Sequence, residues 1–263
     1  MKQQMQAFVA EVIKNRHSRI TWVTFIAFSL APVFGGVFML MMKGSGAEGL
    51  SGAFKSKAVL LSFEANWDSY LGLLSQAVGV GGVLIFGFVA SWLFGREYSD
   101  GTAKDLLSLP ISRAKILNAK FIYYIIWCTA LVVSNLLLGL LIAAPLGLPG
   151  WDSAMFLGNL RVYFITTAMI ILLNTPIAFF AIAGRGFMTP LGIVAILLVL
   201  AQIIGAMGFG TWFPWAVPGI YSGSGGADLK AGLNLFSYLL IVLTGIAGYI
   251  STLLWWRLAD QTK

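Results

Sequence analysis

Six apolar runs, each long enough to cross a bilayer, constrain the fold of this sequence more than any other feature. About twenty helical residues, rising about 1.5 Å each, cross the roughly 30 Å hydrocarbon core of a membrane. Only 10% of the 263 residues are charged, whereas a soluble domain carries about a quarter. We therefore expect an all-α polytopic membrane protein, a single transmembrane domain over residues 1–263. Its spans are expected at residues 20–42, 70–94, 117–144, 162–183, 191–209 and 233–254.

The segment before the first run, residues 1–19, is predicted to form a basic amphipathic helix. Apolar residues recur in it at helical spacing, while charged residues fall on other faces. Helices of this kind lie in the membrane interface, with the apolar stripe toward lipid or toward the protein's own spans. Two interpretations stay open: a simple membrane anchor, or one side of a docking surface. The stripe comprises Met5, Phe8, Val9, Val12 and Ile13.

The densest cluster of charge lies between the second and third runs, at residues 95–115. Seven of these 21 residues are charged, so the segment is expected to sit in water between two spans. Local signals predict a turn at Asp100-Gly101 and then a short crosswise helix at 103–109. This helix would follow the N-cap residue Thr102 and end before Pro110. Its leucines have little of their own domain to pack against, so we expect another molecule to cover them.

Basic residues are distributed unequally between the two sides of the membrane. With a cytoplasmic N-terminus, the inner segments contain twelve lysines and arginines, Lys120 included, and the outer segments contain five. This asymmetry predicts a plasma-membrane protein whose two termini and residues 95–115 lie on the cytoplasmic side. It also accounts for the net charge of +7 without binding to nucleic acid. On the outer side, the tryptophans of residues 210–230 predict a re-entrant segment that dips into the interface and turns back.

Several classes of function lack the residues that they need. The single cysteine, Cys128, and the single histidine, His17, exclude a disulfide and the usual zinc sites. No catalytic triad or phosphate-binding glycine loop is present, so we expect neither an enzyme nor a cofactor in this chain. The spans contain almost no ionisable groups, which disfavours an ion-coupled carrier. Asn135, Asn174 and Gln202 are interpreted as interhelical contacts rather than ligand contacts.

The charged segment resembles the signature loop of ABC-2 permeases, the type-2 ABC exporter family. The similarity lies in Arg96-Glu97-Tyr98-Ser99-Asp100-Gly101-Thr102 and in Leu106-Leu107-Ser108-Leu109-Pro110-Ile111-Ser112-Arg113, and in the layout of six spans around them. The resemblance implies a coupling helix that docks in a cleft of a separate ATPase subunit, which itself binds ATP and Mg²⁺. Ala103 is less bulky than the usual residue there. The implied ATPase-coupling residues are Arg96, Glu97, Gly101, Thr102, Asp105, Leu106, Leu107, Pro110, Ile111 and Arg113.

These observations lead to one principal hypothesis and one rival. The principal hypothesis is a permease subunit, paired with a second copy or with a similar permease in the lipid bilayer. It would export a hydrophobic or amphipathic substrate such as a drug, a lipid or an antimicrobial peptide. The rival is a scaffold or sensor that moves no cargo and docks a cytoplasmic signalling protein through residues 95–115. An adjacent reading frame for a soluble chain with a phosphate-loop motif would favour the first.

Overall fold

The structure is a computed structural model that describes residues 2–16, 18–43, 64–102 and 111–258. The described residues form helices and no strand. Their bounds are α1 (Lys2–Arg16), α2 (Arg19–Lys43), α4 (Trp67–Gln76), the π-helix η2 (Ala77–Gly81), α5 (Gly82–Ser99), α7 (Arg113–Ala143), the short η3 (Ala144–Leu146), α8 (Ser153–Leu173), α9 (Thr175–Ala183), α10 (Met188–Ala206), the short η4 (Gly210–Trp212), α11 (Val217–Tyr221), α12 (Gly226–Ala231) and α13 (Leu235–Leu258).

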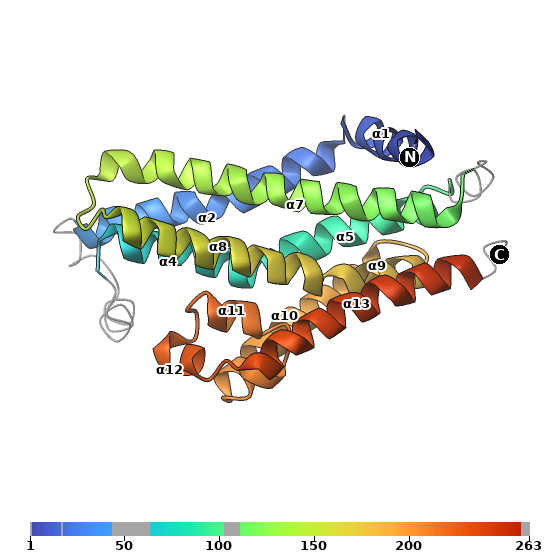
Figure 1. The fold of residues 1–263 in the computed structure, drawn as a ribbon. Coiled ribbons are helices and arrows are strands. Elements are labelled where there is room, and N and C mark those ends of the chain that lie inside the picture. The colour runs from blue at the N-terminus through green and yellow to red at the C-terminus, as the bar shows by residue number, and fades with distance from the viewer. Residues whose placement is uncertain (1, 17, 44–63, 103–110, 259–263) are drawn as a thin grey trace.

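Six helical segments are long and apolar enough to cross a membrane, which confirms the expected all-α polytopic fold. They are α2, the continuous α4–η2–α5, α7 with η3, α8 with α9, α10 and α13. They run side by side, and α1 lies at the same end of the bundle as the last turn of α13 (Figure 1). We call this end the terminal end, and the opposite one the far end.

The second and third spans extend beyond the runs expected from hydropathy. The second is one helical rod from Trp67 to Ser99, and the third begins at Arg113. Residues 95–99 therefore belong to the second span rather than to the connection. A helix can continue beyond the apolar stretch, because its hydrogen bonds are made by the backbone and not by the side chains. The connection between the two spans is thus limited to residues 100–112.

The fourth span is broken into α8 and α9. The break falls at the buried Asn174, two residues before Pro176, because proline cannot donate the next helical hydrogen bond. The Thr175 hydroxyl oxygen lies 2.8 Å from the Leu172 carbonyl oxygen and 2.7 Å from that of Gly245 on α13. A neighbouring helix therefore takes part in closing the break, as membrane helices with internal proline require.

The three polar side chains interpreted as interhelical contacts behave differently. Asn135 does link helices: its amide donates to the Phe28 carbonyl oxygen at 2.7 Å, and the Tyr163 hydroxyl donates to it at 3.1 Å. Asn174 donates within its own span, to Ile170, at 3.1 Å. Gln202 makes no side-chain hydrogen bond to any residue that the structure describes. It lines a cavity instead.

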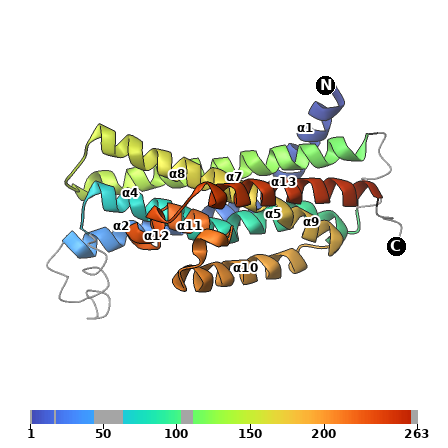
Figure 2. The same cartoon turned by 60° about the horizontal axis from the view of Figure 1, so that its bottom comes forward.

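The chain between α10 and α13 does not project beyond the far end. The helices α11 and α12 lie alongside α4 and α8 in both views (Figures 1 and 2), and α11 packs on η2 and α8. Gly79 permits this close approach, because a Cβ there would clash with the Ser222 hydroxyl and lie 3.0 Å from the Pro218 carbonyl oxygen. Irregular backbone therefore packs against the middle of the second span.

Candidate functional site

The helices that lead into and out of residues 100–112 meet α1 at the terminal end. α5 supplies Arg96 and Glu97 in its last turns, and α7 supplies Lys120 in its third turn. α1 packs on α7 and supplies Glu11 and Lys14. We call these five residues the ion cluster. It joins α1, which precedes the first span, to α5 and α7, the two helices that flank the connection.

The ion cluster is held by short contacts between different helices. Lys120 Nζ lies 2.7 Å from Glu97 Oε1 and 3.4 Å from Glu11 Oε1. Arg96 lies 3.0 Å from the other Glu11 oxygen and also donates to the Asn15 side chain at 2.7 Å. Lys14 reaches Glu97 at 3.4 Å. Each carboxylate is therefore shared by cations from two or three helices.

Burial makes these contacts matter more than surface ion pairs would. Lys120 is fully buried, and Glu11 and Glu97 are each 3% exposed. Removing one partner of a buried ion pair costs about 3–5 kcal/mol, because the remaining charge is left without compensation. Three cations face two carboxylates, and Glu97 Oε2 is buried without a hydrogen-bond partner among the described residues. The three cations therefore have no third carboxylate among the described residues to replace a lost one.

The first helix turns its polar face toward the bundle. Glu11 and Asn15 are buried there, while Met5, Val9 and Ile13 are 64%, 44% and 65% exposed. The main part of the apolar stripe therefore does not pack on the protein's own spans. Of the two directions left open by the sequence, the structure excludes the inward one for these three residues.

The exit from the connection is tied to the last span. The Arg113 guanidinium donates to the Trp256 carbonyl oxygen at 3.2 Å, and the Tyr249 hydroxyl lies 2.7 Å from the Asn118 side-chain oxygen. The rings of Tyr98 and Trp256 lie 6.4 Å apart. α13 therefore contacts both α5, which precedes the connection, and α7, which follows it.

The structure brings together some of the ten residues implied by the resemblance. Arg96 and Glu97 lie in the ion cluster, and Arg113 binds α13. Gly101 is exposed at the expected turn, with a φ of 72° that favours glycine. Thr102 is also exposed, and Ile111 packs against the core. The expected helix at 103–109, with Asp105, Leu106, Leu107 and the following Pro110, lies outside the described residues.

Sequence reasoning missed Glu11 and Asn15 as partners of the site, and it counted Lys120 among the inner basic residues without giving it a partner. The expectation of almost no ionisable group in the spans is wrong at this lysine, which lies within the expected third span. A lone charge inside an apolar run is itself a signal of function, so Lys120 could have been found. Glu11 is the only acid among the first nineteen residues. Nothing in the local sequence shows that it faces inward.

With this geometry described, comparison with known proteins places the chain. Residues 7–202 match the family described as ABC-2 family transporter protein, which is more than half of the chain. The chain belongs to the ABC-2 family. A similar protein is the bacitracin transport permease protein BCRB of Bacillus licheniformis. It is 26% identical to this ABC-2 protein over 179 residues, which cover 68% of this chain and 85% of the relative. No solved structure matches the chain.

Family membership identifies the molecule as a membrane subunit of an ABC transporter. In this ABC-2 subunit the connection follows α5, which ends at Ser99, and precedes α7, which begins at Arg113, and the ion cluster joins both helices to α1. Contacts of 2.7–3.4 Å join these three helices. Both helices that flank the connection are therefore attached to α1.

Proposed function

We propose that this chain is the permease subunit of an exporter driven by a separate ATP-hydrolysing subunit that docks at residues 100–112. ATP and Mg²⁺ would bind to that subunit, because this sequence has no phosphate-binding loop. The observation that carries the proposal is the ion cluster. It joins α5 and α7, the helices that flank the connection, to α1 through buried charges.

The mechanism follows from the cost of breaking buried ion pairs. If α5 moved away from α7, Lys120 would lose the Glu97 carboxylate at 2.7 Å and remain buried with a weaker partner. That penalty, about 3–5 kcal/mol, favours movement of α1, α5 and α7 as one body. Closure of the ATPase around the connection would then tilt the body and open or close the path between spans.

The orientation and assembly follow from charge and family. The excess of basic residues at the terminal end supports a cytoplasmic position for both termini and for the connection, where ATP is available. Two copies, or one copy and a similar permease, would enclose the path. The main part of the α1 apolar stripe would lie in the lipid interface, since it does not pack on the bundle.

The proposed substrate class is an amphipathic peptide antibiotic. Two observations support it: the apolar character of the spans, and the name of the relative, a bacitracin transport permease protein. An amphipathic peptide enters the bilayer surface, so a path with apolar walls can receive it from there. No charged residue in the path is needed to bind such a molecule.

Alanine substitution of two leucines in the connection tests the proposal. We expect Leu106→Ala with Leu107→Ala to insert normally but to lose recovery with the ATPase encoded beside it, and to lose ATP-dependent protection of cells against bacitracin. Each buried leucine that becomes alanine at a tight interface costs about 2 kcal/mol or more. The matched control is Leu137→Ala with Leu138→Ala on α7, away from the connection.

The outcomes separate the hypotheses. Loss of ATPase recovery in the connection variant alone supports coupling. Wild-type recovery and protection in that variant would overturn the role of the connection. Recovery of a signalling protein but of no ATPase would favour the scaffold or sensor.

A further inference from the structure

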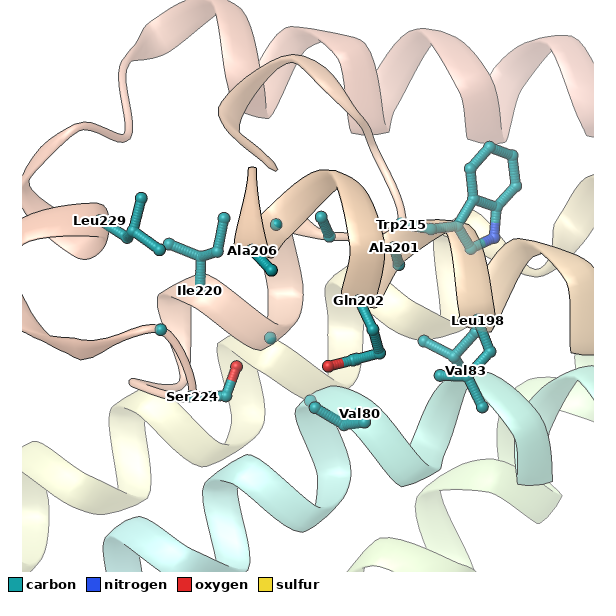
Figure 3. Close-up of a pocket in the computed structure, with 15 residues that line it drawn as sticks. Val80, Val83, Leu198, Ala201, Gln202, Ala206, Trp215, Ile220, Ser224 and Leu229 are labelled. Carbon is teal, nitrogen blue, oxygen red and sulfur yellow. The ribbon is translucent and has the colours of Figure 1, made fainter. Parts of the chain in front are cut away.

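A cavity of about 310 Å³ lies between α10, the π-helix η2 and α11, far from the ion cluster. Figure 3 shows the side chain of Gln202 leaving α10 toward the space beside Val80. The volume is at the lower end of the range for small-molecule sites, about 300–1,000 Å³. The cavity therefore fits a group of a larger molecule rather than a whole one.

The lining combines apolar walls with neutral hydrogen-bonding groups. Val83, Leu198 and Ile220 form part of the walls, and Gln202 and Ser224 supply an amide and a hydroxyl. Neither of these polar side chains makes a hydrogen bond to another residue in the described part of the chain. Trp215 also borders the cavity, and its indole nitrogen is buried with no partner among the described residues. All fifteen described lining residues are uncharged.

The cavity has an open side, where Gln202 and Ser224 are exposed, and an inner wall on the second span. Its walls include η2 in the interior of the second span and the irregular backbone around α11, which lies alongside the spans (Figures 1 and 2). Irregular backbone at membrane depth occurs where it is buried in protein or lines a water-filled cavity. A π-turn within an α-helix also occurs frequently at functional sites. Both features meet at one cavity.

We infer that this cavity binds an uncharged amide group of the exported amphipathic molecule, an inference that rests on the proposed function and names a contact site for its substrate. An amide both donates and accepts, as do the side chains of Gln202 and Ser224. The apolar part of the same molecule packs against Val80, Val83 and Leu198. A charged group is disfavoured, because the cavity offers no counter-ion to offset its desolvation.

Photolabelling of the purified full chain in lipid nanodiscs tests this inference without the ATPase. The probe is a neutral N-acyl dipeptide amide with a diazirine in its acyl chain, and a competitor carries a free carboxylate instead of the amide. We expect labelling of peptides that line the cavity. Gln202→Leu should weaken probe binding about fivefold to tenfold, the effect of losing one hydrogen bond. The carboxylate should compete more weakly than the unlabelled amide.

A second variant pair protects the test against misfolding. Ala206→Phe fills the cavity and should abolish this labelling, whereas Met207→Phe, at the next position and outside the lining, should label as wild type. Equal labelling of the Gln202→Leu and wild-type proteins, or labelling spread evenly over α10, would overturn the inference. Export that persists with no labelling here would leave the proposed function standing and reject only this site.

Discussion

The terminal end and the middle of the second span are held by opposite kinds of chemistry. At the terminal end, Arg96 and Glu97 are buried and bind charged partners on α1 and α7. Around η2, Gly79 lets α11 approach closely, and the neighbouring cavity has no charge in its lining. Ion pairs penalise separation strongly, whereas the contact at Gly79 depends on close packing of small residues. The same helix is thus held by ion pairs next to the connection where the ATPase would dock, and by close packing of small residues next to the cavity where cargo would bind.

The largest expected effect comes from removing one negative charge from the ion cluster. Glu97→Gln keeps the shape of the side chain but leaves three cations facing one carboxylate, so the free energy of unfolding should fall by about 3–5 kcal/mol. Thermal unfolding of the purified protein measures it. Asp100→Asn, an exposed amide replacement three residues later, is the matched control and should behave as wild type.

A second substitution shows whether charge balance is the cause. Adding Lys120→Met to Glu97→Gln removes the surplus buried cation and should recover part of the lost stability. If the double mutant is no more stable than Glu97→Gln alone, Glu97 acts through packing rather than through charge.

An intermediate effect is expected on the uncharged side. In Gly79→Ala the new methyl group meets the Ser222 hydroxyl and the Pro218 carbonyl, so overpacking should cost about 1–3 kcal/mol. Gly81→Ala is the matched control, because no described atom lies within 4 Å of its Cβ position. Equal melting temperatures for the two variants would show that α11 is not seated on η2 as described.

The smallest effect should come from the exposed member of the ion cluster. The Lys14 side chain is 42% exposed, so solvent screens its contact with Glu97. Lys14→Met should cost less than about 1 kcal/mol in the same unfolding assay. A cost as large as that of Glu97→Gln would mean that the exposed Lys14 matters as much as the buried charges. Burial would then not explain the strength of the ion cluster.

The number of spans could be predicted from the sequence because hydropathy is a local property. A run of about twenty apolar residues has no other stable position than the bilayer. The start of the fourth span was less evident, because its helix begins at Ser153, well before the apolar run. The packing of α11 on η2 depends on Gly79, and a glycine alone does not name its neighbour.

The site was only half predictable for a similar reason. Residues 96 and 97 were found through a contiguous pattern, whereas their partners at 11 and 120 are distant in sequence. A helix such as α1 can turn either face inward, and only the cations on α5 and α7 decide that Glu11 faces them. Contacts set by three helices together cannot be inferred from any one of them.

The inward polar face of α1 has a consequence for biosynthesis. Glu11 emerges from the ribosome long before its partners, since Arg96 follows 85 residues later and Lys120 follows 109 residues later (120 − 11). At about 5–20 residues per second, the wait is roughly 5 to 20 seconds. During translation α1 therefore cannot adopt its final position until the third span has been inserted. The first helix to be made is therefore fixed in place only after the second and third spans have been made.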